Sequence, residues 1–196
     1  MRNYISSFAV IICLLAFISN TNAQTLSTEG LLDKALALSA KGDNAGTAEA
    51  LTQGSVALEN EAKDSSGDLK DKILGKVGNL KSLASLASGG KLQSGILGKA
   101  ISAVKMLIGA NRINKLLGKG DSGLLGNAAN LTSSLGLIKA GSSILGSDQQ
   151  GSLNGLLGEA SKSVGEVDKK GIAGKVAAGA ASKQLGSIVK LVSSAL

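Results

Sequence analysis

Apolar residues recur at steps of three and four along most of the chain, which is the spacing of one face of an α-helix. The clearest series consists of Leu69, Ile73, Val77, Leu80, Ala84 and Ala87. Lysines occupy other faces of the same segment, so the predicted helix is amphipathic. No stretch shows sustained alternation or the β-branched enrichment that is typical of strands. The pattern therefore predicts an all-α fold.

The same spacing predicts a Gly-rich helical bundle of about five to seven helices. We expect residues 24–67 to form an acidic helical hairpin, because the turn signal Gly42-Asp43-Asn44 separates two apolar series. Residues 68–196 are rich in Gly, Leu and Lys, and we expect them to form one domain with the hairpin. The helices expected in this second region cover 69–87, 92–108 (with 112–117 as a partial continuation), 124–145, 153–167 and 174–195. In the last helix the residues expected to face inward are Val176, Ala180, Leu185, Ile188, Val189 and Val192.

The first 23 residues have the layout of a secretory signal peptide. Arg2 precedes a mostly apolar run over 5–18, and Thr21-Asn22-Ala23 places small residues at the −3 and −1 positions of a cut before Gln24. The apolar run is short for a membrane span, so cleavage is favoured over a retained signal anchor. The sequence therefore predicts a secreted or periplasmic protein with a signal peptide at 1–23.

Composition removes several chemistries from the remaining 24–196. The chain contains no His, Trp or Pro, and its only Cys, Tyr and Phe residues all fall within the first 23 positions. Without imidazole or thiol groups, zinc, copper and haem sites built on these ligands are excluded. Without aromatic rings there is no stacking platform for bases, sugars or flavins. We therefore predict a non-enzymatic protein with no cofactor and no metal, since only a Ser–Lys dyad or a carboxylate pair is left for catalysis.

Glycine is the most unusual part of the composition, with 27 residues. Each glycine inside a helix costs about 0.5–1 kcal/mol relative to alanine. A dozen such positions would cost roughly 10 kcal/mol, against a net domain stability of about 5–15 kcal/mol. We therefore expect most glycines to mark helix ends or close helix contacts, or the fold to remain marginal until a partner completes it.

Charge divides the chain into an acidic segment followed by a basic one. Nine of the 14 acidic residues lie within 24–72, whereas Asp121 is the only acid between 73 and 147. Basic amphipathic helices suit anionic membrane surfaces. The candidate residues for contact with an anionic surface are Lys70, Lys72, Lys76, Lys81, Lys99, Lys105, Arg112, Lys115 and Lys119. Plain solubility is the alternative role for these charges, and the near absence of Arg and of aromatic residues disfavours nucleic acid.

Small residues gather in the segment 171–181. Gly174, Ala178 and Ala181 follow one another at steps of four and three, which lets another helix backbone come close. We expect these three residues to make a helix contact, and self-association of the chain is one way to make it.

Together these features predict an exported, non-enzymatic α-helical protein. It would act by binding or structural contact with an envelope component, a partner protein or a membrane surface. The alternative is a membrane-active or self-assembling interfacial factor. The two differ in their helices, because a contact protein should be compact in water and an interfacial factor should be loose until lipid is added.

Overall fold

The computed structural model describes residues 26–196, and the predicted signal peptide lies outside the described residues. Over 26–196 the chain is helical and contains no strand, which confirms the all-α prediction. The α-helices are α2 (Thr28–Ala40), α3 (Asn44–Lys63), α4 (Gly67–Ser88), α5 (Ser94–Leu117), α6 (Ala128–Gly141), α7 (Ser147–Val164) and α8 (Ile172–Ala195). Two short 3-10 helices, η1 (Asp121–Gly123) and η2 (Ser142–Ile144), connect them.

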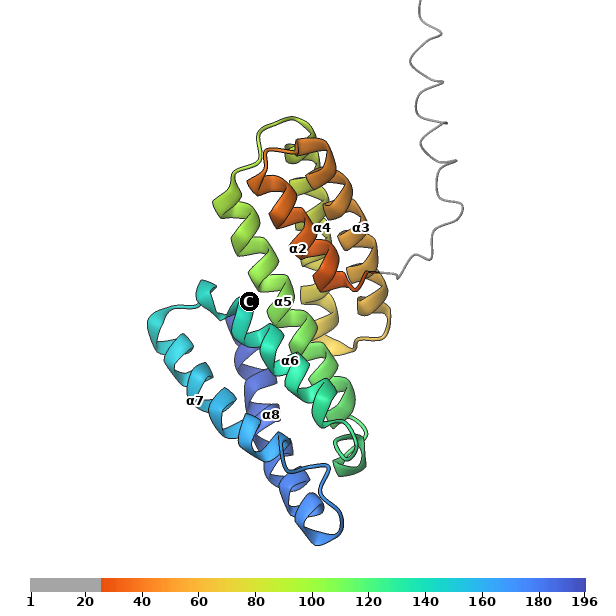
Figure 1. Cartoon of the computed structure of the whole chain (residues 1–196), viewed down its shortest axis with the longest axis vertical. Coiled ribbons are helices and arrows are strands. Elements are labelled where there is room, and N and C mark those ends of the chain that lie inside the picture. Colours follow the sequence, from red (N-terminus) through yellow and green to blue (C-terminus); the bar gives the residue numbers. More distant parts are fainter. Residues whose placement is uncertain (1–25) are drawn as a thin grey trace, which may run out of the picture.

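The long helix α5 runs through both halves of the molecule (Figure 1). On one side, α3 packs against both α2 and α4, and the chain then crosses to α5. On the other side, α6 packs along α5, and the hairpin of α7 and α8 joins them mainly through α8. The fold is therefore two helical layers that share α5, with the α7–α8 turn at the end farthest from α2, α3 and α4 (Figure 1).

One continuous apolar core joins all seven of these helices. Every residue of the series from Leu69 to Ala87 that marked the amphipathic stripe is buried. Burying aliphatic surface is favourable by about 25 cal/mol per Å², so this core is the main source of stability. The segment 112–117 was expected to continue the preceding helix only in part, but it belongs fully to α5. Ile113 anchors it, because this side chain is fully buried in the same core.

The first hairpin forms where the sequence places its turn signal. Gly42 adopts a positive φ of 75°, which a residue with a side chain rarely tolerates. Asp43 then caps α3, since its side chain accepts a hydrogen bond of 2.8 Å from the backbone N–H of Gly46. The turn and the cap together fix α2 and α3 as an antiparallel pair.

Two glycines let α5 and α6 approach very closely. A Cβ atom on Gly109 would lie 2.5 Å from the carbonyl oxygen of Ser134, and one on Gly141 would clash with the carbonyl oxygen of Ser102. On α5, Gly109 comes seven residues after Ser102, and on α6, Gly141 comes seven residues after Ser134. The two glycine–serine contacts are therefore equivalent and repeat along the antiparallel pair. This close contact was not predicted from the sequence.

At other positions, nothing in the folded chain requires the residue to be glycine. Ten of the 27 lie inside helices at places where an added Cβ would meet nothing within 4 Å. They are Gly75, Gly78, Gly95, Gly98, Gly136, Gly151, Gly155, Gly158, Gly179 and Gly186. They neither end a helix nor permit a contact, so they weaken the helices without compensation in the folded chain.

The last helix differs from its prediction at its start. It begins at Ile172, and Leu185, Ile188 and Val192 are buried as expected. The expected inward position of Val176 is wrong, because this side chain is 67% exposed, and Ala180 is exposed as well. Gly174, Ala178 and Ala181 of the same turns are buried, so Val176 and Ala180 are exposed because they lie on other faces of α8. Among the helices of 26–196, none combines the length and the apolar character needed to span a bilayer.

Candidate functional site

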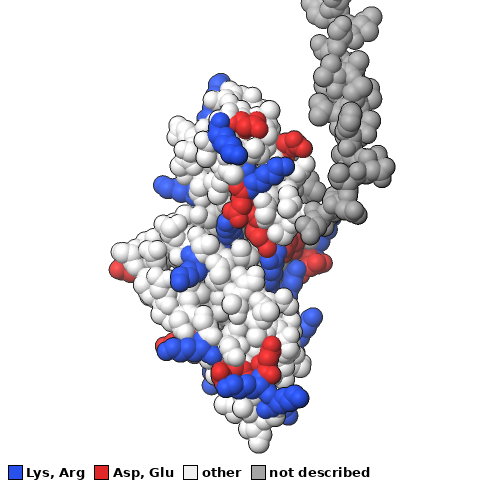
Figure 2. All heavy atoms as spheres, in the orientation of Figure 1, with Lys and Arg blue, Asp and Glu red and all other residues white. Residues whose placement is uncertain are grey.

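The acidic hairpin neutralises much of the basic segment. Four of the nine candidate cations form ion pairs with carboxylates of α2, α3 or the turn after α3. The pairs are Lys81–Glu59 at 3.3 Å, Lys105–Asp33 at 2.5 Å, Lys115–Asp64 at 3.7 Å, and Arg112 with Glu29 and Glu61. Figure 2 shows positive and negative side chains next to one another where α2 lies over α5 in Figure 1. These four cations are therefore bound to the acidic hairpin and are less available to an external anion.

Arg112 is the centre of this pairing. Its Nη1 and Nη2 donate to the two carboxylate oxygens of Glu29 at 2.9 and 3.0 Å. The same Nη2 donates to Glu61 Oε1 at 2.7 Å, and Nε donates to that oxygen at 3.3 Å. The planar guanidinium thus ties the start of α2 and the end of α3 to α5.

The electrostatics of this cluster favour its charged form. Burial by itself raises the pKa of Glu29, but the hydrogen bonds and the charge of Arg112 outweigh it, so the pKa of Glu29 lies below its ordinary value. Burial likewise lowers the pKa of Arg112, and the two carboxylates outweigh it and raise that pKa. The shifts of Glu29 and Arg112 both favour the charged forms, so this contact is a structural ion pair.

The other five candidate cations have no carboxylate partner among residues 26–196. They are Lys70, Lys72, Lys76, Lys99 and Lys119. Lys72 and Lys76 are one turn apart on α4, and Lys76 shares a cavity with Lys99 of α5. The structure thus brings together two of the nine candidates, Lys76 and Lys99, whereas Lys70 and Lys119 are exposed side chains outside this cavity.

We call the cavity shared by Lys76 and Lys99 the junction pocket, because α4, α5, η2, α7 and the end of α8 all contribute to it. Its volume is about 400 Å³. The polar side chains in its wall besides the two lysines are Asn79 and Gln149. Much of the remaining wall is apolar, including Ile96, Ala100, Ala103, Ile144, Leu145 and Leu196. Two cations that form no ion pair within residues 26–196 therefore lie beside hydrocarbon in one cavity.

Two further cavities are less suited to an anion. The first, of about 380 Å³, lies between α5 and α6 and is lined by Arg112, Lys115 and Lys119. Arg112 and Lys115 are already paired with acids of the hairpin, so Lys119 is the one lining cation without a carboxylate partner in the described part of the chain.

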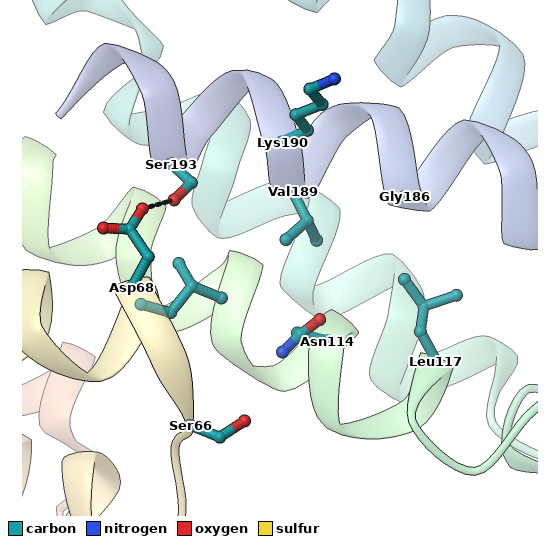
Figure 3. Close-up of a pocket in the computed structure, with 9 residues that line it drawn as sticks. Ser66, Asp68, Asn114, Leu117, Gly186, Val189, Lys190 and Ser193 are labelled. Carbon is teal, nitrogen blue, oxygen red and sulfur yellow. Dashed lines mark hydrogen bonds between the residues drawn. The ribbon is translucent and has the colours of Figure 1, made fainter.

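The second of these cavities, of about 320 Å³, lies between the start of α4, the end of α5 and α8 (Figure 3). Ser193 donates a hydrogen bond of 2.5 Å to Asp68 across it, while the amine of Lys190 points away from Asn114 and Asp68. Its carboxylate and hydroxyl are thus bonded to each other and link α4 to α8.

The three small residues of the predicted helix contact lie on the inner side of α8. Gly174, Ala178 and Ala181 are all buried, and α8 packs against α7. The Cα of Gly174 faces the backbone of the preceding turn, where an added Cβ would lie 3.0 Å from the carbonyl oxygen of Val167. These positions are therefore occupied by contacts within the chain.

Sequence reasoning missed the apolar and amide residues of the junction pocket. Ile144 and Gln149 come from segments far along the chain from Lys76 and Lys99, and no spacing rule connects them. It also missed the exposure of Ile172 and Val176, although the expected contact face of Gly174, Ala178 and Ala181 lies on the opposite side of the same helix.

Comparison of the chain with protein-family models, with curated proteins and with solved structures gives no match. Within 26–196 there is no group of three His, Cys, Asp or Glu residues placed to hold a metal ion.

Proposed function

We propose that this chain is an exported, non-catalytic α-helical protein that works by binding an anionic component of its surroundings in the junction pocket. The component could be part of the envelope, a membrane lipid or a group on a partner protein. What carries the proposal is the placement of Lys76 and Lys99 in one cavity with no carboxylate partner among residues 26–196.

The wall of the pocket narrows the chemistry of the ligand. An ammonium group binds a phosphate or carboxylate as a point charge, and its attraction persists when no internal acid competes for it. Apolar side chains such as Ile96, Ile144 and Leu196 favour hydrocarbon, because removing it from water is favourable by about 25 cal/mol per Å². A ligand that combines a negative head group with a hydrocarbon chain fits both parts of the wall.

The continuous core supports a contact protein over the membrane-active or self-assembling alternative. An interfacial factor would need to open its helices to present an apolar face to lipid. Here the apolar stripes of all seven helices are already packed against one another. The two functions are distinguished by far-ultraviolet circular dichroism in dilute buffer, where the contact protein should be fully helical without lipid and should melt cooperatively.

Calorimetric titration with dodecyl phosphate, a single-chain anionic amphiphile, tests the pocket directly. The double variant Lys76→Gln/Lys99→Gln should bind it roughly 10–30-fold more weakly, since each lysine near an anionic group contributes up to about 1 kcal/mol. The matched control Lys70→Gln/Lys91→Gln removes the same charge from exposed lysines outside the pocket and should bind like the unmodified chain.

Dodecylphosphocholine has the same tail and no net charge, and it should bind much more weakly than dodecyl phosphate. If both double variants lose affinity equally, general charge explains the binding and the pocket does not. Absence of any binding of dodecyl phosphate to the unmodified chain would also overturn the proposal.

A further inference from the structure

The turn between α7 and α8 carries an exposed apolar surface that the packing of the chain does not use. Ile172 is 81% exposed and Val176 is 67% exposed, the largest values among the bulky apolar residues of 26–196. They are one helical turn apart, so both side chains lie on the same face of α8. The other exposed aliphatic residues, such as Val56 at 53% on α3, are not paired in this way.

Lysines surround this apolar pair. We use the name hairpin tip for the surface formed by Lys169, Lys170, Ile172, Lys175 and Val176, whose side chains are all exposed. The acids of the same turn are Glu166 and Asp168, and Glu166 is ion-paired with Lys169. Lys170 and Lys175 have no carboxylate partner among residues 26–196, so the tip keeps an excess of positive charge.

The shape of the hairpin tip suits a lipid surface better than a protein. It lies at the end of the molecule, and Figure 2 shows this end as an uncharged point with charged side chains just above it. A stable protein interface buries about 800 Å² on each partner, far more than two aliphatic side chains can offer. A bilayer needs no matching shape, because a narrow apolar point can enter the head-group layer while cations contact the phosphates.

We infer that the hairpin tip binds anionic membranes, with Ile172 and Val176 entering the head-group layer and Lys170 and Lys175 contacting lipid phosphates. This surface is separate from the junction pocket. The pocket includes Leu196 beyond the end of α8, whereas the tip is at its start, and a helix of 24 residues is roughly 36 Å long. Either surface can therefore fail in experiment without the other.

A single tryptophan reports on insertion, because the chain contains none. In the full chain carrying Ile172→Trp, we expect the tryptophan emission to shift to the blue when phosphatidylglycerol vesicles are added. Brominated lipids should then quench it. The matched control Val56→Trp places the reporter at another exposed aliphatic position, near the acids of α3, and should not respond.

Co-sedimentation with the same vesicles tests the native side chains. Ile172→Ser/Val176→Ser should lower the fraction bound, with the partition coefficient falling roughly tenfold or more, since two aliphatic groups lose their burial. Val56→Ser should leave it unchanged. The double serine variant should still bind dodecyl phosphate like the unmodified chain, which separates this inference from the proposed function. Phosphatidylcholine vesicles should bind all forms much more weakly.

Three outcomes would overturn the inference. Equal shifts at Ile172→Trp and Val56→Trp would mean that adsorption is not localised at the tip. Unchanged sedimentation of the double serine variant would mean that the aliphatic pair does not insert. A blue shift without vesicles that grows with protein concentration would assign the tip to contact with a second copy of the chain.

Discussion

Three of the solvent-facing glycines offer a direct test of how this fold is stabilised. Gly78, Gly136 and Gly155 lie inside α4, α6 and α7, and an added Cβ would meet nothing within 4 Å at any of them. None of them has a positive φ, so alanine fits the backbone without strain. We expect the triple variant Gly78→Ala/Gly136→Ala/Gly155→Ala to fold into the same bundle with greater stability.

The expected gain follows from the number of sites. Each replacement is worth about 0.5–1 kcal/mol, and sites on different helices with no shared contact are close to additive, so the total is roughly 1.5–3 kcal/mol. For a chain of this size each kcal/mol moves the melting temperature by about 2–4 °C, which gives a rise of roughly 3–12 °C. The matched control is Gly109→Ala, whose Cβ would lie 2.5 Å from the Ser134 carbonyl oxygen. It should lose about 1–3 kcal/mol, because α5 and α6 must move apart.

Thermal and urea unfolding followed by far-ultraviolet circular dichroism measure both effects. The triple variant should have a higher urea midpoint with an unchanged slope, since the surface exposed on unfolding stays the same. A triple variant that is less stable than the unmodified chain would refute the reasoning, and so would a Gly109→Ala variant of unchanged stability. Either result would mean that the space around a glycine of this protein does not decide whether alanine stabilises or destabilises the fold there.

Two further predictions concern the cluster around Arg112. Arg112→Gln should lower the free energy of unfolding by about 2–3 kcal/mol, because two half-buried carboxylates lose charged hydrogen bonds. Urea unfolding measures this loss. The control Lys70→Gln should change the free energy little, because Lys70 is exposed and has no carboxylate partner within 26–196. The pKa of Glu29 is lowered in the folded chain, so its contribution to stability should be complete above the ordinary value of 4.5 and should be lost as the pH falls below it. In Glu29→Gln, the loss of stability caused by protonation of Glu29 should be absent from the urea midpoints measured across the acid range. If the variant and the unmodified chain had identical pH profiles, Glu29 would not be the source of this pH dependence.

Much of the fold follows from local spacing in the sequence. The stripe from Leu69 to Ala87, the turn at Gly42 and the inward Leu185 were predicted because each depends on residues a few positions apart. The exposure of Val176 was not, because this residue lies opposite the buried stripe of Gly174, Ala178 and Leu185, and its apolar character alone does not say which face of α8 packs inward. Likewise, nothing in the sequence indicates that Gly109 and Gly141 face serines of the opposite helix.

The candidate site was predicted less well than the fold, for an electrostatic reason. A basic segment was evident from composition, but ion pairing depends on which residues meet in space. Arg112 lies 83 positions from Glu29 and 51 from Glu61, so their contact arises only when α2 and α3 pack beside α5. Of the nine candidate cations, the structure leaves Lys76 and Lys99 in one cavity without a carboxylate partner in the described part of the chain.

The distribution of charge gives the acidic hairpin a definite role. Without α2 and α3, the cations of α5 would make one broad basic surface that attracts any polyanion at long range. The hairpin carboxylates neutralise the central cations, Lys105, Arg112 and Lys115. Among the lysines without a carboxylate partner within 26–196, Lys76 and Lys99 lie near the last residues of α8, and Lys170 and Lys175 lie near its first residues. At each end the free lysines lie beside exposed or cavity-lining aliphatic side chains. Charge beside hydrocarbon favours amphiphilic anions over nucleic acid, which offers charge without an aliphatic part.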